Sequence, residues 1–189
     1  MMILVSQCEK YGQTPRTQSL YSDLLKLLKL IVNFDMYTDF LNTPIGVIKI
    51  QATRYGIAKV IFSDKQECSL SSSLTLKCKR QLIEYFSGKL KKFSLPLDIQ
   101  GTNFQNSIWD EIQNIDFGSC VTYKNIADSV KNPNAARAVG NALNKNPISI
   151  IIPCHRVIRA NGSSIHYSGG LKKKFWLINH EAYIRNILA

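Results

Sequence analysis

The spacing of hydrophobic residues changes near residue 98, and this change divides the chain into two differently built parts. Between residues 46 and 62 apolar side chains alternate with polar ones, and Ile48 and Ile50 share one face. This period of two is typical of half-buried strands. Beyond residue 98 apolar residues recur three and four positions apart, as in amphipathic helices. We therefore expect an α+β fold, with a small antiparallel sheet and a helix followed by a mainly helical part.

The strand-rich part, residues 36–98, predicts an α+β domain. A short aromatic-rich strand over 36–41 precedes a hairpin, whose strands over 46–52 and 57–62 flank a glycine-containing turn. A serine-rich loop then leads into a helix over about 74–86, which the following glycine ends.

The helical part, residues 99–189, begins with Thr102 and Gln105 at capping-box spacing. Two short helices, over about 123–130 and 135–143, flank an Asn-Pro interruption and predict a helix-turn-helix. Three further local features are expected: a cap at Asn134 for the second of these helices, a buried strand over 148–152, and a final helix over 171–187 with Leu171, Phe175 and Ile178 on one face.

The first 35 residues differ from the rest and are treated as an N-terminal extension. Residues 6–19 are polar, and leucines and lysines at helical spacing over 21–32 predict a short amphipathic helix. The start has no basic segment and too short an apolar run for a secretory signal. No apolar run reaches the ~18 residues that a transmembrane helix needs, so we expect no membrane association.

Charge, cysteine content and histidine positions restrict the partners, the cellular compartment and the metal sites that we expect. Lys and Arg number 24 against 13 Asp and Glu, a net charge of +11, which favours a polyanionic partner such as DNA or RNA. The five cysteines are odd in number and lack close pairs, which argues against a disulfide framework and for a reducing, cytoplasmic location. All three histidines occur late in the chain, at positions 155, 166 and 180, so we expect no zinc site.

A candidate nucleophile, Cys154, follows an isoleucine-rich run and precedes His155. A thiolate is the reactive form of cysteine, and a histidine within reach can take the thiol proton. His180-Glu181 on the final helix offers a carboxylate that can orient an imidazole. Most lone buried cysteines are simply small hydrophobic residues, and adjacency alone would leave that interpretation ahead. A cysteine protease is a further alternative, with His166 or His180 as the distant base.

Small residues around one arginine mark the second helix of the helix-turn-helix. Arg137 is surrounded by alanines and a glycine, which would allow close approach to a groove wall. A surface salt bridge is the simpler interpretation of Arg137 alone. The Tyr167–Gly170 segment adds a low-bulk loop whose tyrosine can stack on a planar ligand, although a plain turn would have the same sequence.

Several motifs together resemble the O6-alkylguanine-DNA alkyltransferases, the methylated-DNA–protein-cysteine methyltransferases. The resemblance covers roughly residues 36–182 and rests on motifs that follow one another at the family's spacing. These are Thr43–Gly46, Gly101–Gln105 with Ile108-Trp109, Val121–Tyr123, Asn132–Gly140, Asn146-Pro147, Ile152-Pro-Cys-His-Arg-Val-Ile158, Tyr167–Gly170 and His180-Glu181.

The resemblance implies a ribonuclease H-like domain over 36–98 and a DNA-binding, alkyl-accepting domain over 99–189. It implies single-turnover, irreversible transfer of an alkyl group from O6-alkylguanine, and from O4-methylthymine, to Cys154. His155 would act on the thiol through a water, and Glu181 would polarise His155. Tyr123 would rotate the target nucleotide and donate to the leaving guanine, and Asn146 would be a hinge.

The resemblance also implies a binding surface. Val157, Tyr167 and Ser168 would line the guanine pocket, and Arg137 would fill the gap left in the base stack after base flipping. The helix-turn-helix would enter the minor groove of double-stranded DNA. Its predicted contacts are Tyr123, Lys124, Asn132, Ala135, Ala136, Arg137, Ala138 and Gly140.

We further expect a monomer that needs no cofactor and no metal. Two other functions stay open at this stage. One is a non-catalytic protein that binds alkylguanine DNA, which the presence of Cys154 disfavours. The other is a transcriptional activator of an adaptive response, for which the N-terminal extension is too short to supply a cysteine-rich zinc domain.

Overall fold

The computed structural model describes residues 36–65, 67–163 and 167–187. Residues Tyr37–Ala189 form one compact unit, to which the following description applies. The amphipathic helix expected over 21–32 lies outside the described residues and stays a prediction. Within the described ranges, no helix is long and apolar enough to cross a membrane.

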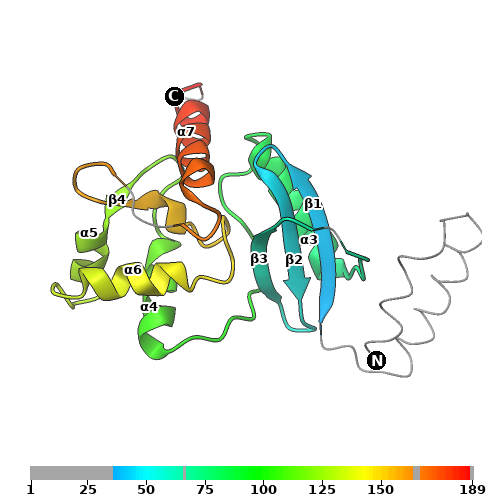
Figure 1. Ribbon diagram of the computed structural model, residues 1–189, viewed down its shortest axis with the longest axis horizontal. Coiled ribbons are helices and arrows are strands. Elements are labelled where there is room, and N and C mark those ends of the chain that lie inside the picture. The colour runs from blue at the N-terminus through cyan, green and yellow to red at the C-terminus, as the bar shows by residue number, and fades with distance from the viewer. Residues whose placement is uncertain (1–35, 66, 164–166, 188–189) are drawn as a thin grey trace, which may run out of the picture. The chain divides into compact units, whose positions relative to one another are not determined.

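A three-stranded antiparallel sheet opens the described chain (Figure 1), in the order β1-β2-β3. The strands are β1 (Tyr37–Thr43), β2 (Gly46–Ala52) and β3 (Ile57–Ser63). The hairpin turn is confirmed, because the Thr53 N–H donates to the Gly56 carbonyl at 2.9 Å. β1 runs two residues beyond the predicted strand and ends at a turn where Gly46 has a φ of 112°, a value that glycine adopts at little cost.

One helix, α3 (Ser73–Phe86), packs on this sheet. Ser72 and Thr75 cap its start reciprocally, and Gly88 with a φ of 76° follows its end. Asp39 of β1 is buried and accepts a hydrogen bond from the Lys79 ammonium at 2.9 Å. The ion pair ties the helix to the sheet and leaves the apolar side of α3 to the core.

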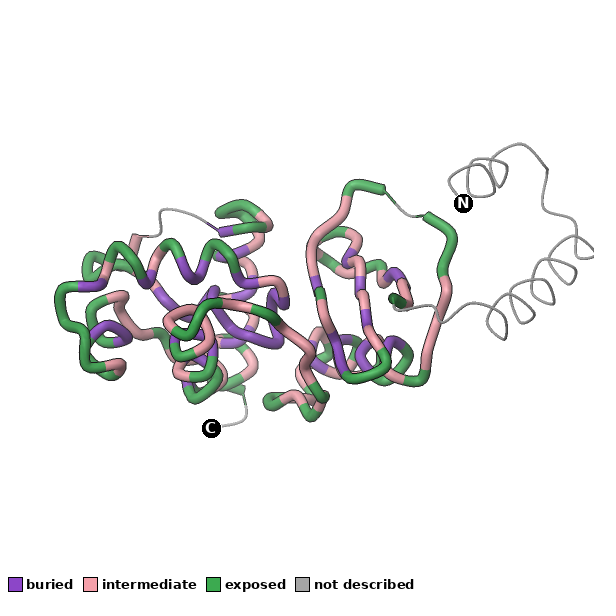
Figure 2. Tube along the Cα trace, turned by 90° about the horizontal axis from the view of Figure 1, so that it is seen from below, coloured by how far each residue is buried: buried purple, intermediate pink, exposed green. Residues whose placement is uncertain are grey.

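The second part is mainly helical and confirms the predicted fold class. It contains α4 (Asn103–Ile112), α5 (Tyr123–Ser129), α6 (Ala136–Asn144) and α7 (Leu171–Ile187), with a short helix η1 (Cys154–Arg156) and a two-stranded parallel pair of β4 (Val121–Thr122) and β5 (Val157–Ile158). The predicted capping box of Thr102 and Gln105 is present. Buried and exposed residues alternate along these elements, as Figure 2 shows.

The edge of the sheet holds the segment that leads to the predicted nucleophile. The Val60 N–H of β3 donates to the Pro147 carbonyl at 2.9 Å, and the Ser149 N–H donates to the Val60 carbonyl at 2.8 Å. Segment 147–149 is thus paired with β3 as a short parallel bridge. The sheet therefore fixes the position from which the chain approaches Cys154.

The prediction of a strand over 148–152 is wrong, although all five residues are buried as expected. The segment turns tightly: the Ile152 N–H donates back to the Ile148 carbonyl at 3.0 Å, and Ile150 has a φ of 73°. A β-branched residue rarely adopts a positive φ. The side chain of Asn146 bonds the Ile148 N–H and the Ile152 carbonyl, both at 2.9 Å, and so holds the turn closed.

Asn134 does not cap α6. The N-cap is Ala135, which makes no side-chain capping bond. Its N–H donates to the Asn132 carbonyl at 2.9 Å. The turn thus continues one residue further, and the helix begins after it.

The buried face of α7 also differs from the predicted one. Leu171 and Phe175 are each 40% exposed, and the buried residues are Lys174, Leu177 and Glu181. Two of these three carry a charge, so apolar periodicity could not locate the face. Their polar groups are instead satisfied by partners in the site.

Candidate functional site

Cys154 stands at the first position of η1 and is 5% exposed. The Asn146 side-chain N–H lies 3.2 Å from its Sγ and donates to it. Burial raises the pKa of Cys154, whereas the hydrogen bond from Asn146 and the charge of Lys174 act to lower it. The resting thiol is therefore protonated at neutral pH, and its activation needs a base together with groups that stabilise the thiolate.

A histidine next to Cys154 is hydrogen-bonded to a carboxylate. The His155 Nε2 lies 2.8 Å from Glu181 Oε1, and both side chains are buried. Burial lowers the pKa of His155, which keeps the imidazole neutral. A neutral ring that donates from Nε2 to the carboxylate leaves Nδ1 as the acceptor, an assignment that follows from the hydrogen-bond network. The residue order and the contact between His155 and Glu181 agree with the sequence expectation.

Glu181 is held ionised by its neighbours. Burial opposes ionisation, but hydrogen bonds from His155 and Arg156 outweigh it and lower the pKa of the carboxyl group. Arg156 donates from Nε to Oε2 at 2.9 Å and from Nη2 to Oε1 at 3.0 Å. The Gly118 N–H adds a bond to Oε2 at 2.9 Å. The carboxylate is thus fixed in position and orientation, as a buried charge requires.

Lys174 is a buried cation that the sequence interpretation missed. It is 1% exposed, and its ammonium donates to the Val157 carbonyl at 2.7 Å. Burial lowers its pKa. It is the last of three consecutive lysines, 172–174, and only its helical spacing of seven residues to Glu181 could have singled it out. Its charge acts on Cys154 and favours the thiolate.

Two buried polar atoms in this region have no hydrogen-bond partner among the described residues: the His155 Nδ1 and the Tyr167 hydroxyl. Buried polar groups are nearly always paired with protein or water. Tyr167 contacts the Phe62 ring edge-on at 6.2 Å. The Ser168 hydroxyl lies 3.2 Å from that of Ser149.

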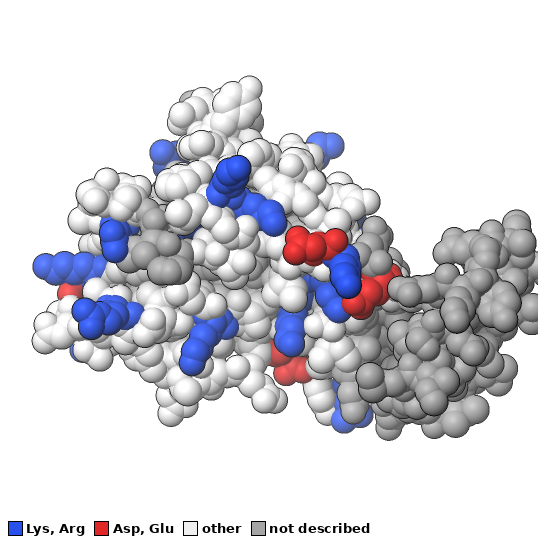
Figure 3. Space-filling view, viewed as in Figure 1, with Lys and Arg blue, Asp and Glu red and all other residues white. Residues whose placement is uncertain are grey.

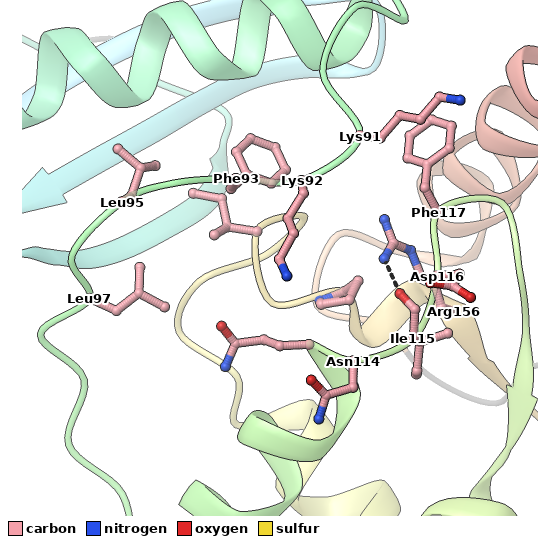
Figure 4. Close-up of a pocket in the computed structure, with 13 residues that line it drawn as sticks. Lys91, Lys92, Phe93, Leu95, Leu97, Asn114, Ile115, Asp116, Phe117 and Arg156 are labelled. Carbon is pink, nitrogen blue, oxygen red and sulfur yellow. Dashed lines mark hydrogen bonds between the residues drawn. The ribbon is translucent and has the colours of Figure 1, made fainter.

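Arg156 also lines a cavity of about 440 Å³ (Figure 4), where it donates to the Ile115 carbonyl at 2.6 Å. Figure 4 shows the Lys92 amine directed into the space near this guanidinium. Cys154 is not among the described residues that line the cavity. A ligand in this cavity would contact Arg156, which is bonded to Glu181, rather than the Cys154 sulfur.

A second cavity of about 500 Å³ lies over the predicted helix-turn-helix. It brings together five of the predicted DNA contacts and adds others that the sequence did not single out. The predicted ones are Tyr123, Lys124, Ala136, Arg137 and Gly140, and the additional ones are Thr122, Asn141, Asn144, Arg159 and Ala160. An added Cβ at Gly140 would lie 3.7 Å from the Tyr123 ring, an ordinary packing distance, so Gly140 of α6 lies next to Tyr123 of α5.

Three of the predicted DNA contacts do not line this groove. Ala135 is buried, Asn132 is exposed in the turn between the helices, and Ala138 is exposed on α6. Arg137 itself is exposed. Figure 3 shows one face of the molecule, on which basic side chains dominate and acidic ones gather over the sheet. The groove over the helix-turn-helix is lined by Lys124, Arg137 and Arg159 and by no acidic residue among the described ones, so it carries the positive charge expected of a polyanion site.

Tyr123 lines the groove and also lies near the buried Lys174. It is the first residue of α5, and its ring is 6.0 Å from the Lys174 ammonium. Val157, which is fully buried, pairs with Val121 and so places β5 beside the start of that helix. Among the described residues no group of three or more His, Cys, Asp or Glu could hold a metal ion.

A buried cysteine next to a histidine that a carboxylate holds, in a chain that carries a basic groove on a helix-turn-helix, is the arrangement expected of a DNA-binding protein with a reactive cysteine. Known proteins identify the family. The family model "6-O-methylguanine DNA methyltransferase, DNA binding domain" matches residues 103–183, and "6-O-methylguanine DNA methyltransferase, ribonuclease-like domain" matches residues 36–99. The chain belongs to the 6-O-methylguanine DNA methyltransferase family.

Individual relatives agree. The chain is 40% identical over 153 residues to the methylated-DNA–protein-cysteine methyltransferase of Methanosarcina acetivorans, covering 77% of this chain and 98% of the relative. The crystal structure of Mycobacterium tuberculosis O6-methylguanine methyltransferase is 30% identical, with a TM-score of 0.73 over 82% of this chain and 99% of that one. A structure of the same organism's OGT in complex with DNA is 34% identical, with a TM-score of 0.71 over 78% and 93%.

Proposed function

We propose that Cys154 is the acceptor of the alkyl group and that the groove at Arg137 holds the damaged duplex. The chain is a methylated-DNA–protein-cysteine methyltransferase, a DNA repair protein that transfers an alkyl group from DNA to itself. The observation that supports Cys154 is the convergence on one sulfur of Asn146, which bonds Sγ, and of the Lys174 charge. The adjacent residue is the histidine that Glu181 orients.

The transfer step is a displacement at carbon. The thiol proton moves to Nδ1 of His155 through a water, and Glu181 stabilises the imidazolium that forms. The Cys154 sulfur then attacks the alkyl carbon of O6-alkylguanine, a carbon–sulfur bond forms, and the carbon–oxygen bond breaks. The departing guanine takes a proton from the Tyr123 hydroxyl. A thioether does not return to a thiol in this site, so each molecule reacts once.

The geometry of binding follows from the same residues. A base stacked in a duplex keeps its O6 substituent away from a buried sulfur, so the nucleotide must flip out. Arg137 of α6 and Tyr123 line the same groove, which supports the proposal that Arg137 occupies the vacated stack. We propose that α6 enters the minor groove and that Val157, Tyr167 and Ser168 surround the flipped guanine. One monomer is sufficient, because all these groups come from one chain.

Intact-mass spectrometry tests the proposal directly. After incubation with duplex DNA that contains one O6-methylguanine, the protein should gain the mass of one methyl group, and peptide mapping should place it on Cys154. Duplex DNA with unmodified guanine is the control. Binding to the lesion without a change in mass would contradict the transfer and favour a non-catalytic lesion-binding protein.

Glu181→Gln should slow alkylation at neutral pH by about 10- to 10²-fold, within the range of general-base contributions. The amide can donate to Nε2, which favours the tautomer that no longer accepts at Nδ1. A higher pH should restore part of the rate, because solvent base then removes the thiol proton. The measurement is the pH dependence of the rate with O6-benzylguanine, a free base.

The surface variant Glu67→Gln, which also removes one carboxylate, is the matched control. Loss of the Glu181 charge leaves Arg156 buried and unpaired, which costs about 3–5 kcal/mol of stability. Rates are therefore compared at a temperature where circular dichroism finds both variants folded. Unchanged pH–rate behaviour of Glu181→Gln would remove this carboxylate from the mechanism.

A further inference from the structure

A residue of the N-terminal part reaches the carboxylate that orients the base. The Tyr85 hydroxyl, on α3, donates to Glu181 Oε1 at 2.7 Å, and the tyrosine is fully buried. The same oxygen accepts from His155 at 2.8 Å and from Arg156 at 3.0 Å. Three donors from three different positions therefore share one acceptor atom.

The Tyr85 hydroxyl acts as a hydrogen-bond donor to this oxygen. Burial and the neighbouring Glu181 charge raise the pKa of Tyr85, so its hydroxyl stays protonated. Its ring is fixed by Phe93 at 5.5 Å and Phe117 at 6.0 Å, and by the His180 ring at 5.7 Å. The hydroxyl is therefore held in place by packing that does not depend on the hydrogen bond.

A donor at Oε1 changes how strongly the carboxylate acts on the histidine. Each hydrogen bond to an ionised carboxylate stabilises the charge and lowers its basicity. A less basic carboxylate attracts the Nε2 proton of His155 less, and so stabilises the imidazolium less. Removal of the Tyr85 hydroxyl should consequently make His155 more basic.

We propose that Tyr85 is a positioning residue for alkyl transfer, which acts through Glu181 to set the basicity of His155. The consequence of this inference for alkyl transfer rests on the proposed function. The effect of Tyr85 on the pKa of His155 rests only on the hydrogen bonds described above. The N-terminal part thereby takes part in tuning the site, in addition to supporting the segment before Cys154. Other titratable or charged groups also face His155 and Glu181, and the test leaves all of them unchanged. They are Arg156, Lys174, Cys120, Cys154 and Tyr167.

The test is Tyr85→Phe in the full chain, which keeps the ring and removes only the hydroxyl. Tyr183→Phe is the matched control, because Tyr183 lies on α7 near Glu181 in sequence but is 67% exposed. The titration of the three histidine rings is followed by nuclear magnetic resonance with isotope-labelled histidine, and His155→Gln assigns the His155 signals. Thermal unfolding of each variant is recorded alongside.

The pKa of His155 should rise by about 0.3–1 unit in Tyr85→Phe and stay unchanged in Tyr183→Phe. Above the midpoint, where the ring is neutral and can take the thiol proton, transfer from O6-benzylguanine should accelerate by up to the same factor, about 2- to 10-fold, because each pH unit is one decade. A lower melting temperature with an unchanged His155 titration, or a shift to lower pKa, would overturn the proposal and leave Tyr85 a structural residue. A raised His155 pKa in a protein that accepts no alkyl group would uphold the action of Tyr85 and contradict the proposed function instead.

Discussion

Cys154→Ala is expected to abolish alkyl transfer while the protein still binds DNA. The substitution removes the only atom placed to attack the alkyl carbon in the proposed mechanism. DNA affinity should change by less than about 1 kcal/mol, since phosphate contacts and the groove over α5 and α6 supply the binding. Transfer is measured with labelled O6-methylguanine duplex, and binding with an undamaged duplex of the same sequence.

Cys68→Ala is the matched control, because it removes an exposed thiol and leaves the site intact. It should react at the wild-type rate. A Cys154→Ala protein that became labelled on another cysteine at a normal rate would show that the acceptor has been assigned wrongly. Loss of both transfer and binding would show that the substitution disturbs the helix-turn-helix as well.

Local sequence signals predicted much of the fold. The alternation around Ile48 and Ile50, the capping box at Thr102, and the glycine after α3 each act within a few residues, and each is found where the sequence placed it. The helix-turn-helix could also be predicted from the sequence, because an Asn-Pro pair separates two short helical repeats of apolar residues. These features depend on neighbours in the chain rather than on tertiary contacts.

The polar network of the site was only partly predictable. Residue type and order only suggested Cys154, His155 and Glu181, and the family resemblance assigned their roles; the structure brings His155 and Glu181 into contact. Tyr85 was missed as a member of the site because its partner lies 96 residues away, and its own helix accounts for its burial. Lys174 was missed because a lysine in a run of three is normally an exposed residue.

The tight turn before Cys154 shows why the apolar run over 148–152 was wrongly predicted to be a strand. A run of isoleucines is compatible with any buried conformation, and β propensity depends strongly on context. The conformation is decided by Asn146, whose side chain bonds two backbone groups of the run and the sulfur of Cys154. One polar side chain thus shapes the backbone and contacts the proposed nucleophile.

Arg137→Ala should separate base flipping from chemistry. A flipped nucleotide leaves a hole in the base stack, and opening it costs a few kcal/mol. Arg137 is exposed on the groove beside Tyr123, and its side chain is long and planar enough to fill that hole. Lys145→Ala is the matched control, because it removes one exposed positive charge at the other end of α6.

Transfer from O6-methylguanine duplex should fall by about 10- to 10³-fold in Arg137→Ala, since about 1.4 kcal/mol corresponds to one decade in rate. Reaction with free O6-benzylguanine should hardly change, because a free base needs no flipping and Arg137 does not contact the sulfur network described above. Lys145→Ala should weaken duplex binding only as far as a single charge does, and at high salt the difference should vanish. An equal loss with both substrates would mean that Arg137 supports the fold or the pocket, and the role in filling the base stack would then have to be abandoned.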